Sequence, residues 1–169
     1  MHQNWTVWRT ERSSIKMTAN RFVLVLLFGF VLIYVPARLF SVVAWPARIG
    51  MLQVAGIVIC ATGAAIALLC VSSFAFIGKG TPAPFAAPRR LVTRGPYRLV
   101  RNPMYIGVGT FFVGAAVFFQ SLLFLAYALL FFLSSHLFVV LYEEPTLRRT
   151  FGDEYTAYCG RVKRWSPKL

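Results

Sequence analysis

Four long apolar blocks follow one another along the chain. They predict helical membrane spans at about residues 22–40, 49–76, 104–119 and 121–142. A helix needs about 20 apolar residues to cross a hydrocarbon core ~30 Å thick, so the third block is short and the second leaves room for tilt. We therefore predict an all-α integral membrane protein, a single domain covering residues 1–169 with about four transmembrane helices.

Polar segments separate the blocks unevenly. Residues 77–103 form a loop rich in arginine and proline, whereas only a few uncharged residues around Gln120 separate the third and fourth spans. These two spans must therefore form a tight helical hairpin. The tail, residues 143–169, mixes aromatic with basic side chains, which is typical of an amphipathic segment lying on the membrane. We expect this tail to close a pocket at the cytoplasmic end of the hairpin.

Lysine and arginine alternate between the segments. The N-terminal segment carries four, the next loop two, residues 79–101 six, the hairpin turn none and the tail six. Cytoplasmic segments carry the excess of basic residues in membrane proteins. The pattern predicts that both termini are cytoplasmic, with the long loop and the tail on the same side.

Composition narrows the class of protein. The chain is 58% apolar and 14% charged, with a net charge of +13. Its basic residues flank the apolar blocks, so anionic lipid headgroups and topology explain the charge, and we predict no nucleic-acid binding. The cysteines, at positions 60, 70 and 159, form no pattern of metal ligands or disulfides, and we predict no metal site.

Polar groups gather at one end of the predicted hairpin. The stretch "LVTRGPYRLVRNPMYIGVG", residues 91–109, leads into the third span, and Glu143 and Glu144 follow the fourth. Pro103 suits the first turn of a helix and Asn102 its N-cap. The hairpin brings the two ends together, so we expect a cytoplasmic-side pocket there. Its predicted residues are Tyr97, Arg98, Arg101, Asn102, Tyr105, Gly107, Gly109, Glu143 and Glu144.

Two motifs carry a resemblance to a known family. "RGPYRLVRNPMYIG" and "EEPTLRRTFGDEYTAYCGRVKRW" resemble membrane methyltransferases related to isoprenylcysteine carboxyl methyltransferase and phosphatidylethanolamine N-methyltransferase. The upstream "GKGTPAPFAAPRRLV" is similar to bacterial members, so we expect a bacterial inner-membrane protein. The resemblance implies S-adenosylmethionine as cofactor and a lipid-like or isoprenoid methyl acceptor. It does not identify the acceptor or say whether oxygen, nitrogen or sulfur is methylated.

The family pattern implies roles for individual residues. Arg101, Asn102 and Glu144 are the expected catalytic residues, with Arg101 suited to the cofactor's carboxylate. Glu143 and Glu144 can accept hydrogen bonds from its hydroxyl and amino groups. The tyrosines offer aromatic faces to its sulfonium. Gly107 and Gly109 leave a bare helix surface that either another backbone or a ligand, such as the adenosine, could approach. One departure is Asn102, where the family has a histidine, because an amide cannot titrate near neutral pH.

Other possibilities stay open. His136 lies within the fourth span on the same helix face as Glu143, which makes it a candidate for the substrate pocket. It could equally be a neutral histidine bonded to a neighbouring helix. A non-catalytic membrane scaffold that keeps the fold is an alternative function, and a relative of membrane sterol reductases is a weaker one. The sequence does not fix the oligomeric state.

Overall fold

A computed structural model describes residues 30–73, 76 and 91–167 of the chain. Residues 22–29 of the first predicted span and residues 77–90 of the predicted loop lie outside the described residues. Every regular element in the described part is helical, as predicted. The N-terminal unit contains a π-helical turn, Phe30–Tyr34, that leads into helix α2, Val35–Val42. It is described separately from the unit that begins at Val42.

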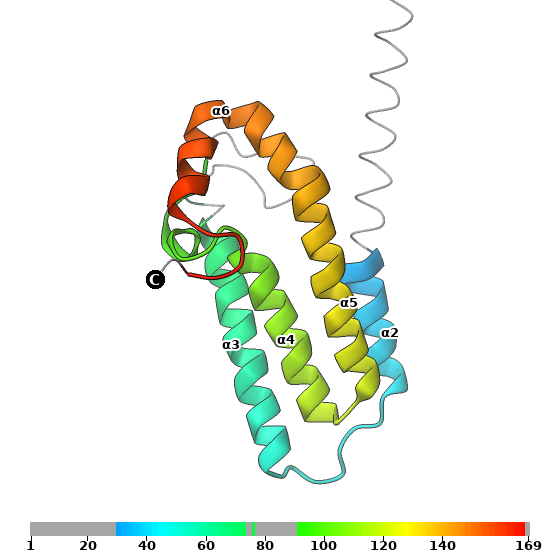
Figure 1. Cartoon of the computed structure of the whole chain (residues 1–169). Coiled ribbons are helices and arrows are strands. Elements are labelled where there is room, and N and C mark those ends of the chain that lie inside the picture. The colour runs from blue at the N-terminus through cyan, green and yellow to red at the C-terminus, as the bar shows by residue number, and fades with distance from the viewer. Residues whose placement is uncertain (1–29, 74–75, 77–90, 168–169) are drawn as a thin grey trace, which may run out of the picture. The chain divides into compact units, whose positions relative to one another are not determined.

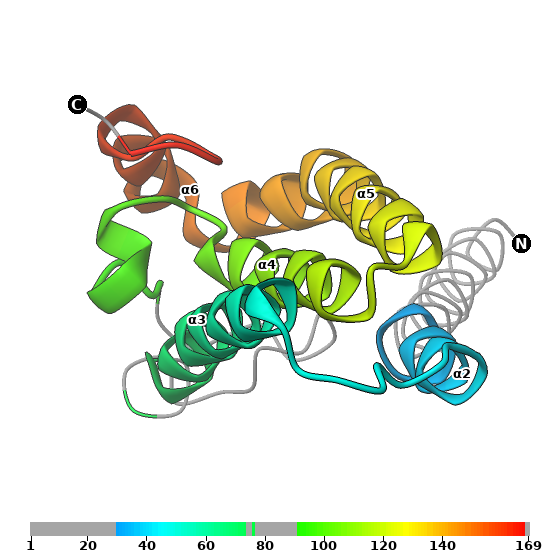
Figure 2. The same ribbon diagram turned by 90° about the horizontal axis from the view of Figure 1, so that it is seen from below.

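Three helices form the body of the second unit. They are α3 (Met51–Ser73), α4 (Pro103–Phe119) and α5 (Leu122–Phe138). They lie side by side, and α4 occupies the middle place and packs against both neighbours (Figures 1 and 2). The predicted second, third and fourth spans thus coincide with helices, each within a few residues of the predicted ends.

Glycine allows α3 and α4 to approach each other closely. A Cβ atom on Gly63 would lie 2.5 Å from the backbone nitrogen of Phe111, and one on Gly114 would lie 2.5 Å from that of Cys60. Neither contact leaves room for a side chain. Packing of small residues is the main attraction between helices in lipid, so this interface explains why the predicted second span is rich in glycine and alanine.

The interface between α4 and α5 is aromatic. The ring of Phe112 meets that of Tyr127 edge-on, with centroids 4.7 Å apart, and also contacts Phe131. Gln120 makes the turn between the helices in a left-handed conformation, with φ at 50°. The next amide, that of Ser121, donates to the carbonyl oxygen of Ala116 at 3.0 Å. This turn ends α4 and produces the predicted hairpin.

The outer surfaces of these helices are apolar. On α5 the large apolar side chains that are exposed are all leucines, at positions 122, 123, 125, 129, 130, 133 and 137. Among the described residues, two helices are long and apolar enough to cross a membrane, judged by length and composition: α3 and the continuous helix Leu122–Arg161. Helix α4 is apolar but has only 17 residues. The arrangement with four spans remains a prediction.

The helical chain continues beyond α5. A π-helical turn, Val139–Glu143, leads into α6, Glu144–Arg161. Gly152 kinks α6 with φ at 50°, a conformation that favours glycine. The second half of α6 descends from this kink beside the start of α4 (Figure 1). Buried Tyr155, Tyr158 and Val162 hold it there, so the tail folds back over the end of the helices where the site was predicted.

Candidate active site

The segment before α4 turns sharply before the helix begins. A 3₁₀ turn, Gly95–Arg98, starts at Gly95 with φ at 64°. Pro103 opens α4 and Asn102 is its N-cap residue, as predicted. The Asn102 side chain does not cap the helix, however. It is buried, and its Nδ2 donates to the carbonyl oxygen of Arg164 at 3.3 Å, so it joins α4 to the C-terminal segment.

Arg101 extends into the space between α4 and α6. Its Nη1 lies 3.1 Å from Oε1 of Glu144 and donates to the sulfur of Cys159 at 2.8 Å. Its backbone N–H donates to the carbonyl oxygen of Lys163 at 2.9 Å. The Nε atom is buried and has no hydrogen-bond partner among the described residues. An unsatisfied buried donor is costly, so Arg101 retains one N–H group suited to an acceptor from outside the protein.

Glu144, at the start of α6, is buried and fully engaged. Arg164 donates to both of its oxygens, from Nε at 2.7 Å and from Nη2 at 2.9 Å, and Arg101 approaches the first of them. Burial acts to raise the pKa of this carboxyl, but the hydrogen bonds from Arg164 and the charge of Arg101 outweigh it and lower the pKa below its ordinary 4.5. Glu144 is therefore ionised and held between two arginines.

Glu143 and Tyr105 form the second polar pair. The Tyr105 hydroxyl donates to Oε2 of Glu143 at 2.9 Å. Tyr105 lies in the first turns of α4 and Glu143 in the turn after α5, so this bond ties together the two ends of the hairpin. The predicted convergence of Arg101 and Tyr105 with the two glutamates is present in the structure.

The other predicted residues before α4 differ in exposure. Tyr97 is buried against Cys70 and Val92. Its carbonyl oxygen accepts a hydrogen bond from the hydroxyl of Tyr158 at 2.7 Å. Burial raises the pKa of the Tyr97 phenol, which therefore stays protonated at neutral pH. Arg98, at the end of the same 3₁₀ turn, is exposed.

Gly107 and Gly109, two of the three glycines of α4, face neighbouring helices in this structure, which is one of the two uses that we expected for them. A Cβ on Gly107 would lie 2.8 Å from the backbone nitrogen of Ala67 in α3. A Cβ on Gly109 would lie even closer to the ring of Phe132 in α5. At both glycines a neighbouring helix occupies the space that a side chain would need, so in this structure these glycines serve helix packing. Sequence alone could not separate these two uses of a small residue.

His136 meets the C-terminal segment. Its Nδ1 accepts a hydrogen bond from the indole Nε1 of Trp165 at 3.1 Å, and the two ring centroids are 6.0 Å apart. The Trp165 ring also meets the Tyr105 ring edge-on, with the two ring centroids 6.5 Å apart. The hydrogen-bond partner of His136 thus lies in the C-terminal tail. Because the Trp165 indole contacts both His136 and Tyr105, it links α5 to α4.

Three residues of the site were missed by the sequence reasoning: Cys159, Arg164 and Trp165. All come from the tail, which we treated as one amphipathic segment. Their positions depend on the kink at Gly152 and on the extended backbone at Val162, with φ at −123°. A signal was available, because an arginine and a tryptophan after the last predicted helix could pair with the glutamates and with an aromatic residue.

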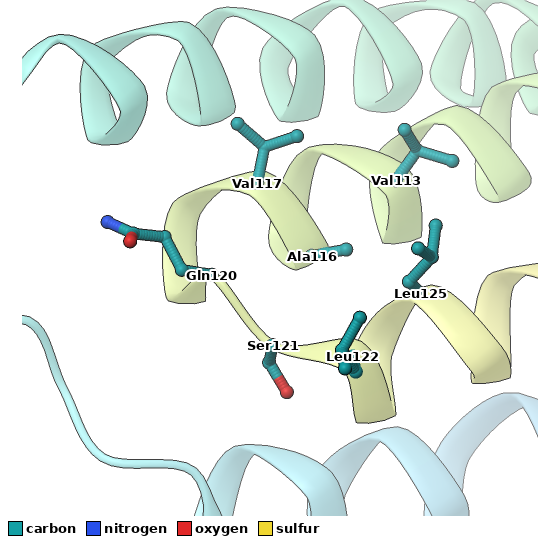
Figure 3. Close-up of a pocket in the computed structure, with 7 residues that line it drawn as sticks. All are labelled: Val113, Ala116, Val117, Gln120, Ser121, Leu122 and Leu125. Atoms are coloured by element: carbon teal, nitrogen blue, oxygen red, sulfur yellow. The ribbon is translucent and has the colours of Figure 1, made fainter.

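A cavity lies at the opposite end of α4. Figure 3 shows its apolar lining around the hairpin turn, and its volume is about 170 Å³. It is lined by Val113, Ala116, Val117, Gln120, Ser121, Leu122 and Leu125. None of the predicted site residues contributes to it. The polar site and this cavity are therefore separate features at the two ends of the hairpin.

Comparison with known proteins adds one finding. The family model described as phospholipid methyltransferase matches residues 51–154, which is more than half of the chain. The matched region contains α3, α4, α5 and the first part of α6, and it includes every predicted site residue. No curated protein sequence matches the chain significantly.

Proposed function

Because the chain belongs to the phospholipid methyltransferase family, a family of membrane methyltransferases, we propose that it transfers a methyl group from S-adenosylmethionine to a lipid-like acceptor at the cytoplasmic membrane face. One observation carries the proposal. Residues of the two family motifs, Arg101 with Tyr105 and Glu143 with Glu144, meet within hydrogen-bonding distance at one end of a helical hairpin.

The structure offers a test of whether the cofactor suits these residues. The buried Nε of Arg101 needs an acceptor that the described residues do not supply. A carboxylate is the strongest acceptor for a guanidinium, and the methionine end of S-adenosylmethionine carries one. The donor set at Arg101 therefore fits this end of the ligand.

The two glutamates divide their roles. Glu144 has both oxygens engaged by Arg164, so we assign it to holding Arg101 in place. Glu143 uses Oε2 to accept from Tyr105, and its second oxygen can accept from a hydroxyl or ammonium group of the ligand. This refines our expectation that Arg101 and both glutamates bind opposite ends of one molecule, because Arg101 and Glu144 are in direct contact.

Aromatic side chains complete the proposed site. The Tyr105 ring, next to that of Trp165, can face a sulfonium cation, which aromatic faces attract. When bound, S-adenosylmethionine supplies an electrophilic methyl group. The residues of the chain then have to align the acceptor with that methyl group and exclude water. Such a role requires no titrating group at Asn102, so the missing family histidine is compatible with transfer.

The acceptor is proposed to be a lipid that enters sideways from the bilayer. The surface near the end of α5 is apolar, because Leu137 of α5 and Leu141 of the following π-helical turn are 48% and 72% exposed. That turn ends at Glu143. A lipid tail can pack along such a surface while its headgroup reaches the polar site. Isoprenylated and phospholipid acceptors both meet this description.

Transfer of a labelled methyl group tests the proposed function. Purified protein in lipid nanodiscs is incubated with S-adenosylmethionine labelled in its methyl group, and label is counted in the extracted lipid. We expect label in the lipid with the wild type and with Arg149→Ala, an exposed position, and none above background with Arg101→Ala. Equal incorporation in all three variants, or none in the wild type with bacterial lipids, would reject the proposal.

A further inference from the structure

We propose that residues 163–167, here called the strap, form a gate over the site, fastened by Arg164 and Trp165, and that the strap must open before a ligand reaches Arg101. This inference rests on the proposed function for the identity of the ligand. The fastening itself is a property of the protein alone.

The first fastening point is the pair of Arg164 and Glu144. Two parallel hydrogen bonds, at 2.7 and 2.9 Å, join the planar guanidinium to the carboxylate. This geometry is the strongest that an arginine and a carboxylate form. Because Arg101 contacts the same carboxylate, the strap is linked through Glu144 to the residue proposed to bind the cofactor.

The second fastening point is Trp165. Its indole donates to His136 on α5 and its ring contacts Tyr105 on α4. Trp165 therefore lies across the mouth between the two helices of the hairpin. It stands next to the Tyr105–Glu143 pair, which we propose to face the ligand, so a closed strap covers that pair.

The backbone of the strap adds two weaker contacts. The carbonyl oxygen of Lys163 accepts from the Arg101 amide at 2.9 Å, and that of Arg164 accepts from the Asn102 side chain at 3.3 Å. Both donors belong to the residues directly before α4. The closed strap thus fixes the positions of Arg101 and Asn102.

The strap is separable from the helix that carries it. Tyr155 and Tyr158 of α6 are buried, and Tyr158 is bonded to the carbonyl of Tyr97. The helix ends at Val162, whose backbone is extended, and beyond it Lys163, Ser166 and Pro167 are exposed. A segment with so few buried contacts opens at much lower cost than the whole fold. The strap can therefore open while α6 stays in place.

Trypsin provides a direct measure of opening. Cleavage after Arg164 requires its side chain to enter the protease, so Arg164 must first leave Glu144. We would measure the release of the peptide that begins at Trp165, by mass spectrometry, from the full-length protein in detergent without ligand. The variants are Glu144→Gln, His136→Leu and His136→Gln, of which the last keeps an acceptor for the indole.

The two fastening points predict different changes. Losing a charge-assisted pair should speed cleavage by about ten- to a hundredfold in Glu144→Gln, and losing a neutral hydrogen bond by about two- to tenfold in His136→Leu. His136→Gln should match the wild type. Equal cleavage rates in all four proteins would overturn the fastening and with it the gate.

A second measurement tests access to the site. The association rate of S-adenosylmethionine, followed by stopped-flow tryptophan fluorescence, should rise in His136→Leu and stay unchanged in His136→Gln. Unchanged association despite faster cleavage would overturn the gate. A wild type that binds no S-adenosylmethionine would reject the proposed function instead, and the ligand-free cleavage rates keep the two failures apart.

Discussion

Glu144 connects three segments of the chain. It stands at the start of α6, contacts Arg101 before α4 and accepts two hydrogen bonds from Arg164 in the strap. Breaking a buried pair by removing one partner leaves an uncompensated charge, which is much more costly than losing an exposed pair. A single carboxylate therefore holds the geometry of the site.

Glu144 makes the stability of the fold depend on pH in the acid range. Its pKa is lowered in the folded state, so the carboxylate contributes its full stabilisation above the ordinary value of 4.5. That contribution is lost as the pH falls through the lowered pKa. We expect the difference in Tm between wild type and Glu144→Gln to be constant between about pH 7 and 5.5 and to shrink in more acid solution.

Thermal unfolding in detergent, followed by circular dichroism across this pH range, checks the expectation. Glu154→Gln, at an exposed position of the same helix, is the control and should differ little from the wild type. A Tm difference that stays unchanged down to about pH 3 would show that the Glu144 pairs do not depend on its ionisation.

The part of the site built from the two ends of the hairpin could be predicted from the sequence. Arg101 and Tyr105 begin one helix of a hairpin, and Glu143 and Glu144 end the other, so the topology alone brings them together. The partners from the strap were out of reach, because the path of residues 163–167 depends on the kink at Gly152. Nor could the pattern distinguish a glycine that faces a ligand from one that faces a helix, as at Gly107.

At the scale of elements, α3 and α4 form the most extensive helix–helix contact in the described part of the chain. Gly56, Gly63, Gly107 and Gly114 lie along this contact, and a Cβ atom added at any of them would clash with backbone atoms of the other helix. The long apolar runs predicted these helices because a membrane span leaves little choice of structure. The sequence did not show which face of each helix is buried, because nearly all positions in such runs are apolar.

Gly63 provides a test of the helix contact. Its Cβ would lie 2.5 Å from the backbone nitrogen of Phe111 and 2.6 Å from the carbonyl oxygen of Gly107. Backbone atoms cannot move aside as side chains do, so we expect Gly63→Ala to destabilise the protein by about 1–3 kcal/mol. Gly160→Ala, where nothing lies within 4 Å of the added atom, is the matched control.

Thermal unfolding of the two alanine variants measures the difference. Gly160→Ala should be neutral or slightly stabilising, because alanine favours a helix more than glycine does. A Gly63→Ala variant as stable as the wild type would mean that α3 and α4 do not pack this closely.

At the scale of the whole molecule, orientation decides which compartment the site faces. The basic residues concentrate in the segments on one side of the predicted spans, and the polar site lies at that same end of α4 and α5. We therefore predict that the site opens to the cytoplasm, where S-adenosylmethionine is made. The apolar cavity at the hairpin turn would then face the opposite side.

Reporter fusions test this orientation. A reporter attached after residue 169 and one inserted at Gln120 should be found in opposite compartments, the first in the cytoplasm. If both reporters were found in the same compartment, the third and fourth predicted spans would not form a membrane hairpin. The predicted cytoplasmic orientation of the site would then be wrong as well.

The central claim is that Arg101 binds the carboxylate of S-adenosylmethionine, and titration calorimetry on the purified protein in detergent tests it most directly. We predict measurable binding to the wild type, and to Arg149→Ala within about threefold, since surface substitutions change little. Arg101→Ala should bind about thirty- to several-thousand-fold more weakly, as expected when one partner of a sheltered charge pair is removed. Equal affinity in the three proteins, or no binding to the wild type, would contradict the account.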